Sequence, residues 1–451
     1  MSFRRHWLDR ITSKLFGSTN RSRRRAARPQ QAETLEQRQY LSATMTLLND
    51  GHTLSIAGDS GDNYIAIAQD ERGVHVMADG APAQSFTGIE RILVSTGLGN
   101  DDVRVIHGFN PQPDPPGDQW RSLDLRVSLG AGDDTFAADI QIPSGKITVG
   151  VNAEAGNDVV TFRTLIDPNF LIDPNFVIDP NFRDVMLHAN LGDGNDVFNG
   201  DLAFPPDPCR LNVIGGKGAD SINALIGSLS SATPAGDVNG TIDVSLNGGD
   251  DNDDIRSKLS NVTLNGRALI NLQGGAGNDV VLQTLDMVTV NAGLDVFAYG
   301  GAGDDYVVLS NSPASRTTAE VTPTLFANSR VGLHLLGDAG SDRIIGLIQP
   351  CIMPDGSVSM IFSGGSGNDV ISILMGLEAV EADPPPEGEA HGEHDGPIFL
   401  AAVGGDGDDL LNLSVRNLDQ SMSPLTLVLR GGLGNDTAVV TPGIDASGWT
   451  N

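Results

Sequence analysis

Hydrophobic and polar residues alternate with a period of two along much of the chain, which is the pattern of a β-strand with one buried face. Leu125-Arg126-Val127-Ser128-Leu129 is one such segment, and Ile371-Ser372-Ile373 is another. Each lies beside a glycine-rich stretch that predicts a tight turn. Aromatic residues make up only 5% of the chain, so the core must be built from Val, Ile and Leu. The pattern therefore predicts an all-β protein of many short strands.

The glycine-rich turns recur about thirteen times with the form GGxGxD, as in Gly364-Gly365-Ser366-Gly367-Asn368-Asp369. The sixth position is Asp in twelve copies and Asn63 in the other, and a large apolar residue follows two places later in twelve. Glycine permits positive φ and close backbone approach. Asn or Asp at the fifth position is expected to bond its own backbone. The apolar residue after each turn is expected to point inward.

The spacing of the turns predicts how they stack. Successive motif ends lie 24 to 40 residues apart, with a base unit of 24–27 and insertions in the longer intervals. One insertion is a threefold repeat, Leu165–Phe170, followed by residues 171–176 and 177–182. A unit this short cannot bury a core alone and must stack on its neighbours. We therefore expect an elongated β-solenoid (β-helix or β-roll-like) over residues 44–440, with about 13 coils and one turn per coil, between a basic arm (1–43) and a tail (441–451).

Charge divides the chain into two unlike parts. The whole chain carries 28 basic and 58 acidic residues, a net charge of −30, whereas residues 1–40 carry ten basic and three acidic residues. An acidic body repels nucleic acid and suits cations. No window approaches 18 uninterrupted apolar residues, so no transmembrane helix is expected. Cys209 and Cys351 are separated by five repeat intervals, too far to form a disulfide in a stack.

The segment Leu35-Glu36-Gln37-Arg38-Gln39-Tyr40-Leu41-Ser42-Ala43 resembles the LEPR-XLL motif of large repetitive proteins from planctomycete-type bacteria. Leu35, Glu36, Arg38 and Leu41 match that motif, whereas Gln37 replaces its Pro and Tyr40 replaces a Leu. The resemblance implies sorting or processing of a protein exported to the cell envelope or beyond. The alternative is that this segment is a disordered linker.

The turn and its following apolar residue resemble the nonapeptide GGxGxDxUx of the repeats-in-toxin (hemolysin-type) calcium-binding proteins. In that family, Ca²⁺ lies between the Asp carboxylates and glycine carbonyls of adjacent turns. The resemblance implies calcium ligands at Asp101, Asp134, Asp158, Asp196, Asp220, Asp253, Asp279, Asp305, Asp342, Asp369, Asp409 and Asp436. The copies ending at Asp158 and Asp253 lack motif glycines and are expected to be the weakest sites. The family's turns are tandem, whereas these are single, so one edge column is expected rather than a two-sided β-roll.

Electrostatics gives a separate argument for cations. Stacked strands are about 4.8 Å apart, so the carboxylates of a column would be equally close. Two like charges at that distance repel by roughly 1 kcal/mol in water, and several-fold more near a protein surface. The column therefore needs cations or raised pKa values. Calcium, with six to eight loosely arranged oxygen ligands, suits such a site. The alternative is that Asx-type hydrogen bonds hold the turns without metal.

These observations favour a non-enzymatic, exported, calcium-binding rod with a structural or adhesive role at the cell surface. Its expected partners are calcium ions and a cell-surface polysaccharide or protein. The alternative is a carbohydrate-active solenoid enzyme, which requires a cleft of clustered Arg, Lys, Tyr or carboxylate side chains. The only close histidine pair, His391 and His394, lacks the H-E-x-x-H spacing of a zinc site. A third hypothesis is a fragment or module whose partner binds the Pro-rich loops.

Overall fold

A computed structural model describes residues 43–70, 72–108, 122–141, 145–165, 183–202, 208–227, 236–238, 240–311, 325–327, 329–348, 351–352, 356–376, 397–416 and 425–441. Several expected features lie outside these ranges: the basic arm and the LEPR-XLL-like segment through residue 42, the repeated insertion at 166–182, the pair His391 and His394, and the tail from residue 442.

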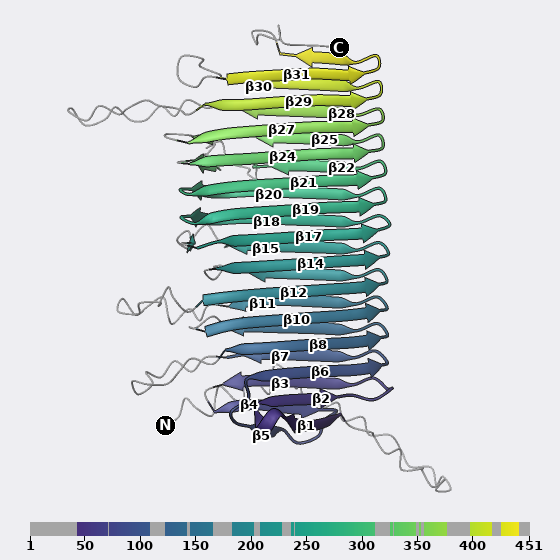
Figure 1. Cartoon of the computed structure of the whole chain (residues 1–451), viewed down its shortest axis with the longest axis vertical. Helices are drawn as coiled ribbons and strands as arrows, with labels where there is room; N and C mark the ends of the chain where they lie inside the picture. Colours follow the sequence, from purple (N-terminus) through teal and green to yellow (C-terminus); the bar gives the residue numbers. More distant parts are fainter. Residues whose placement is uncertain are drawn as a thin grey trace, which may run out of the picture.

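Two long β-sheets lie face to face along the whole molecule (Figure 1). The first sheet consists, in order, of β1 (Thr44–Leu48), β2 (Thr53–Ala57), β6 (Arg91–Leu98), β8 (Leu123–Ala131), β10 (Gly145–Ala155), β12 (Arg183–Asp193), β14 (Cys209–Lys217), β17 (Ile242–Asp250), β19 (Arg267–Ala276), β21 (Gly293–Ala302), β24 (Arg330–Ala339), β27 (Ser357–Ser366), β29 (Ile398–Asp406) and β31 (Leu425–Leu433).

The second sheet is paired strand by strand in the same way. It consists, in order, of β5 (Gln84–Phe86), β4 (Gly73–Ala78), β3 (Tyr64–Asp70), β7 (Asp102–His107), β9 (Thr135–Gln141), β11 (Val159–Leu165), β13 (Val197–Leu202), β15 (Ser221–Gly227), β18 (Asp254–Leu264), β20 (Val280–Val290), β22 (Tyr306–Ser310), β25 (Arg343–Ile348), β28 (Val370–Gly376), β30 (Leu410–Arg416) and β32 (Thr437–Val440).

Each coil is one strand of the first sheet, a glycine-rich turn and one strand of the second sheet. Thirteen such coils follow one another in the described ranges, from β2 and β3 to β31 and β32. From β2 onward, successive strands of the first sheet pair in parallel, as do the corresponding strands of the second from β3. The elongated β-solenoid with one turn per coil is therefore confirmed. In the part of the chain described here, no helix is long and apolar enough to cross a membrane.

The core is a set of stacked aliphatic and aromatic side chains between the two sheets. The large apolar residue two places after each sixth position points inward, from Ile65 at 0% exposed to Leu411 at 2%. Phe136 and Phe198 hold this position, and Phe162 of the intervening coil lies two residues further along its strand. The three rings pack edge to face, with ring centroids 5.8 and 5.6 Å apart. Such contacts add to the hydrophobic stabilisation. The predicted inward orientation is confirmed.

The middle coils have a short third side. β18 bends at Asn261 (φ 50°) and β20 bends at Met287 (φ 57°), and each strand continues beyond its bend. The continued segments pair with β16 (Gly236–Val238) and β23 (Leu325–Ala327), and β23 pairs in turn with β26 (Cys351–Ile352). Val262 and Val288 are buried there. These bends enlarge the core of the middle coils.

The amino-terminal end of the solenoid is closed by strands that run against the others. β1 pairs antiparallel with β2 after a single 3-10 turn, η1 (Asn49–Gly51), and β4 and β5 pair antiparallel beyond β3. An open sheet edge is a template for unwanted pairing, so covering it protects the fold. The inward-pointing side chains of the first coil are buried, with Leu54 and Ile65 both at 0% exposed.

Two positions of the turn favour glycine, and from the turn at 96–101 onward only Glu154, Asp251 and Asp338 replace it there. The second and fourth positions have positive φ, for example 114° at Gly301 and 131° at Gly303. A Cβ atom at Gly303 would also collide with the carbonyl oxygen of Gly277 in the preceding coil. The first-position glycines, such as Gly300, do not have positive φ, so their role is different.

Replacing a fourth-position glycine should therefore destabilise the solenoid. We expect Gly303→Ala to lower the free energy of unfolding by about 2 to 4 kcal/mol, because it combines an unfavourable φ with a backbone collision. Gly150→Ala is the matched control, because Gly150 has no positive φ and no heavy atom within 4 Å of the added Cβ. Chemical denaturation of both variants checks this. An equal effect of the two substitutions would contradict the assigned role of the turn glycines.

Candidate functional site

The sixth-position residues form a single column along the turn edge of the solenoid, at the right of Figure 1. All the predicted ligand residues except Asp436 are buried, at 0 to 3% exposed, and Asp436 in the last coil is half-buried. Their carboxylates therefore point into the molecule rather than toward solvent. The stack brings together every aspartate predicted from the sequence, including Asp158 and Asp253.

One oxygen of each of these carboxylates is used to join neighbouring coils. The Asp305 N–H donates to Asp342 Oδ1 at 2.8 Å, and the Asp342 N–H donates to Asp369 Oδ1 at 2.8 Å. The same bond links every consecutive pair from Asn63 to Asp436, at 2.6 to 3.0 Å. We call this continuous series, with its twelve aspartates, the aspartate ladder. Each bond satisfies a backbone N–H that would otherwise be buried alone.

The fifth-position residues form a second ladder that runs in the opposite direction. The Asn278 side chain accepts a hydrogen bond from the Asp304 N–H of the next coil at 2.9 Å, and Asp304 accepts from the Ser341 N–H at 2.8 Å. The prediction that these side chains bond their own backbone is wrong. Stacking places the next coil's N–H closer than the residue's own turn. We call this series the fifth-position ladder, and nothing in a single turn signals it.

The second carboxylate oxygen of each ladder aspartate has no hydrogen-bond partner. Oδ2 of all twelve aspartates is buried and unbonded, including Asp279, Asp305 and Asp369. A buried polar atom without a partner is costly, and a buried charge is more so. The ladder therefore satisfies half of each carboxylate and leaves a row of free oxygens inside the protein.

Burial raises the pKa of the ladder carboxyls. The pKa rises to about 7 at Asp158, Asp220, Asp253 and Asp305. It rises to about 6 at Asp134, Asp342 and Asp369. Loss of hydration is the main cause, and repulsion from neighbouring carboxylates adds to it, whereas the hydrogen bond from the preceding coil's backbone opposes the shift. The charged column is thus unfavourable without a neutralising proton or cation.

The first-position glycines leave room beside these free oxygens. A Cβ atom at Gly364 would collide with Asp369 Oδ2 and with the carbonyl oxygen of Gly404 in the next coil. The same pair of oxygens, one carboxylate and one glycine carbonyl, flanks Gly215, Gly248, Gly274, Gly337 and Gly404. Carboxylate and carbonyl oxygens are the ligands that Ca²⁺ takes in proteins. The residues present therefore fit a calcium ion best in the coils from Gly215 onward.

Not every coil offers this arrangement. The first position is Thr96, Leu129, Ala153 and Leu191 in the coils ending at Asp101, Asp134, Asp158 and Asp196. Across the described ranges, no group of three or more His, Cys, Asp or Glu side chains is placed to hold a metal. An ion between two turns would thus contact at most two carboxylates and would depend on backbone carbonyls. Asp253, expected to be among the weakest sites, has the carbonyl-flanked glycine, and Asp158 does not.

Asn63, the one sixth-position residue that is not Asp, lies at the amino-terminal end of the column. Its Oδ1 accepts from the Asp59 N–H at 3.0 Å, and its Nδ2 donates to Asp59 Oδ1 at 3.3 Å. It therefore bonds within its own turn, because no earlier turn of the ladder lies beneath it. Asn63 is buried, yet neither of its side-chain polar atoms lacks a partner.

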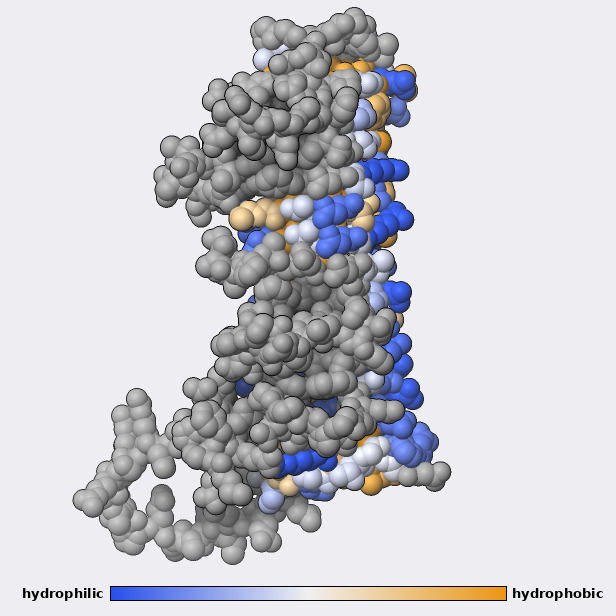
Figure 2. All heavy atoms as spheres, turned by 90° about the vertical axis from the view of Figure 1, so that its left-hand side faces the viewer, coloured by the Kyte–Doolittle hydropathy of each residue, from blue (hydrophilic) through white to orange (hydrophobic). Residues whose placement is uncertain are grey.

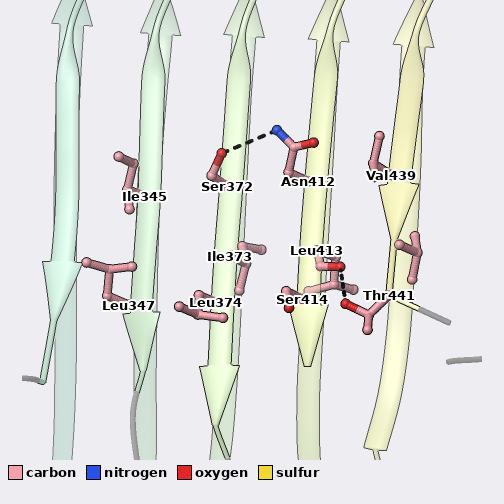
Figure 3. Close-up of a pocket in the computed structure, with 11 residues that line it drawn as sticks. Ile345, Leu347, Ser372, Ile373, Leu374, Asn412, Leu413, Ser414, Val439 and Thr441 are labelled. Carbon is pink, nitrogen blue, oxygen red and sulfur yellow. Dashed lines mark hydrogen bonds between the residues drawn. The ribbon is translucent and has the colours of Figure 1, made fainter. Parts of the chain in front are cut away.

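A hollow of about 410 Å³ lies on the outer face of the second sheet, over β25, β28, β30 and β32 (Figure 3). Ile345 and Leu347 line it together with Ser372, Asn412 and Ser414. The Asn412 amide and the Ser372 hydroxyl are 3.5 Å apart. None of these side chains titrates near neutral pH. This lining differs from the cleft of charged side chains that the enzymatic alternative requires.

The fold and the ladder define a class: a parallel β-solenoid repeat protein with buried aspartates stacked along one edge. Comparison with protein-family models found no match, and neither did searches of curated proteins and of solved structures.

Proposed function

We propose that this chain is an exported, non-enzymatic repeat protein that binds calcium along the aspartate ladder and has a structural or adhesive role at the cell surface. The observation that carries the proposal is the choice of Asp at every internal rung. Each such Asp, and Asp436 at the carboxy-terminal end, has one buried, unbonded oxygen, whereas the amino-terminal rung is Asn63 with both polar groups bonded.

Asparagine could replace aspartate in the ladder without a change of shape. Asparagine has the same size as aspartate, and its oxygen could accept the same ladder hydrogen bond without a buried charge. A ladder needed only for its hydrogen bonds would lose nothing by carrying Asn. Twelve buried carboxylates are costly unless something at Oδ2 requires a negative oxygen. A cation between successive turns supplies that requirement, and the amino-terminal rung has no earlier turn with which to share one.

The holding groups would be the free Oδ2 atoms, such as those of Asp220, Asp279 and Asp369, with first-position glycine carbonyls from the next coil. A bound Ca²⁺ supplies positive charge that neutralises adjacent carboxylates. The ladder hydrogen bonds fix the carboxylates, and the glycines admit the ion. Because neighbouring coils share each site only when stacked, metal binding favours the folded rod over the loose chain.

The need for calcium and the polar surface both favour a role outside the cytosol. Calcium is scarce in the cytosol and abundant outside the cell, so an exported chain would gain its metal after export. Hydrophilic residues follow the outer margin of the described surface in Figure 2. Cross-strand ion pairs such as Arg91–Asp124 and Arg267–Asp295 join neighbouring strands of the first sheet. A long rod with polar faces suits a structural or adhesive partner such as a surface polysaccharide or protein.

Calorimetric titration of the full chain with calcium tests the proposal. We expect several ions per chain, and fewer in the double variant Asp279→Asn with Asp305→Asn. The matched control is Asp304→Asn with Asp408→Asn, which changes exposed fifth-position carboxylates whose oxygen accepts a bond that Asn can also accept. The control should bind as many ions as the unmodified chain. No binding at millimolar calcium, or an equal loss in both variants, would refute calcium binding by the ladder.

A further inference from the structure

The rod contains one junction at which the turn edge is built differently from every other described junction. It lies between the coil of β14 and β15, with the turn Gly215–Asp220, and the coil of β17 and β18, with the turn Gly248–Asp253. Both sheets pair fully across it, from Cys209 with Ile242 to Gly227 with Ser260. The aspartate ladder is also intact there, because the Asp220 N–H donates to Asp253 Oδ1 at 2.8 Å.

The first departure is a missing rung of the fifth-position ladder. Ala219 accepts nothing, because its side chain has no oxygen, so the Asn252 N–H has no side-chain acceptor in the preceding coil. On either side the ladder resumes: the Ala219 N–H donates to Asn195 Oδ1 at 2.8 Å, and the Asn278 N–H donates to Asn252 Oδ1 at 2.6 Å. Elsewhere even a serine keeps the rung, with the Asn368 N–H 3.3 Å from Ser341 Oγ.

The second departure is a strained residue at a position that needs glycine. Asp251 replaces the fourth-position glycine and has φ of 77°. A non-glycine residue in this left-handed region costs roughly 1 to 2 kcal/mol. Glu154 and Asp338 are also left-handed, but they occupy the second position of turns whose fourth position is glycine.

The third departure is in the backbone bonds that join the turns. From Gly99 onward, except at the two junctions that the turn Gly248–Asp253 makes, the fourth-position N–H donates to the next turn's third-position carbonyl oxygen at 2.7 to 3.0 Å. At this junction the Gly218 N–H lies 3.3 Å from the Asp250 carbonyl oxygen. At the following junction, toward the turn Gly274–Asp279, the Asp251 N–H makes no bond to the Ala276 carbonyl oxygen. Lys217 pairs with Asp193, which belongs to the earlier coil. These differences are independent of the missing side-chain rung.

We propose that this junction is the weakest coil–coil interface of the solenoid and divides it into two separately cooperative blocks, one ending at β15 and one beginning at β17. In a stacked array, stability is the sum of the coils' own contributions and the interfaces between neighbours, so an array opens at its weakest interface. The missing side-chain rung, the left-handed Asp251 and the longest of these fourth-position backbone bonds coincide at this junction. The rod can then open at this junction while each block stays folded.

Hydrogen exchange of the full chain in chelator, with increasing denaturant, tests the division. We expect the strands β12 and β14 to exchange through one opening and β19 and β21 through another, with rates at least about tenfold apart. The repair variant Ala219→Asn with Asp251→Gly should bring the two sets together. Asn278→Ala removes the rung to Asp304 at an intact junction, and by itself it should accelerate exchange only locally.

Two outcomes would overturn the inference. One is a single opening that governs all four strands in the unmodified protein. The other is two openings whose separation the repair variant does not reduce. Because the measurement is made in chelator, its result does not depend on whether the aspartate ladder binds calcium.

Discussion

In the absence of divalent cations, the protein will melt several degrees lower at about pH 8 than at about pH 5, the reverse of ordinary acid denaturation. The cause is the ladder carboxyls, whose pKa rises from 3.8 to about 6 at Asp369 and to about 7 at Asp305. Because the folded-state pKa is raised, the native state binds more protons than the unfolded chain at pH values between 3.8 and about 7. Stability is therefore fully present below about pH 4 and is lost as the pH rises toward 7.

One buried histidine acts in the opposite direction. Burial lowers the pKa of His107 to about 4, so its contribution to stability is lost as the pH falls from about 6.5 to 4. Burial also lowers the pKa of His334. Seven ladder carboxyls have a pKa of about 6 or 7, and they outnumber these two histidines. Melting curves in chelator at several pH values check the balance. A melting temperature that rises steadily from pH 5 to pH 8 would contradict the assigned burial of the ladder carboxylates.

Asp305→Asn should have opposite effects with and without calcium. In chelator at about pH 8 the substitution removes a buried, half-bonded charge and keeps an oxygen for the Asp279 N–H, so we expect stabilisation by about 1 to 3 kcal/mol. In calcium it removes a ligand oxygen, so the variant should gain less stability from the ion than the unmodified chain does. Thermal or chemical denaturation of both proteins, in chelator and in calcium, measures the effect of the substitution on stability under each condition.

Asp304→Asn is the matched control for this experiment. Asp304 is the neighbouring, exposed residue of the same turn, and its Oδ1 accepts from the Ser341 N–H at 2.8 Å. An asparagine oxygen accepts the same bond, so the free energy of unfolding should stay within about 0.5 kcal/mol in both conditions. If Asp305→Asn behaves like this control, the buried Oδ2 has no special role. If it is destabilising in chelator as well, the negative charge is needed for the fold itself.

Much of the fold could be predicted because its determinants are local and repeated. A strand with period two, a glycine turn and an inward apolar residue such as Phe136 or Ile371 recur in every unit, and insertions leave the register intact. The short third side at Asn261 and Met287 could not be predicted in this way. Each bend depends on a single left-handed residue within a long strand, and such a residue has no sequence signal of its own.

The candidate site could be located but its chemistry could not be completed from the sequence. The motif placed all twelve aspartates in one column, because turns of equal length stack in register. It did not indicate that Oδ1 of a residue such as Asp342 accepts a backbone bond from the preceding coil, leaving Oδ2 alone. Nor did it indicate that fifth-position side chains such as Asn278 accept hydrogen bonds from the backbone of the next coil. Both depend on contacts between coils, which a motif read within one turn does not contain.

The central claim is that the free oxygens of the aspartate ladder hold calcium. The most direct test is the melting temperature of the full chain at about pH 8 in millimolar calcium compared with chelator, where the uncompensated column is least stable. The account predicts an increase of several degrees in calcium, with no comparable increase in magnesium, which demands stricter octahedral geometry. An unchanged melting temperature would contradict it and would leave the ladder as a set of hydrogen-bonded structural turns.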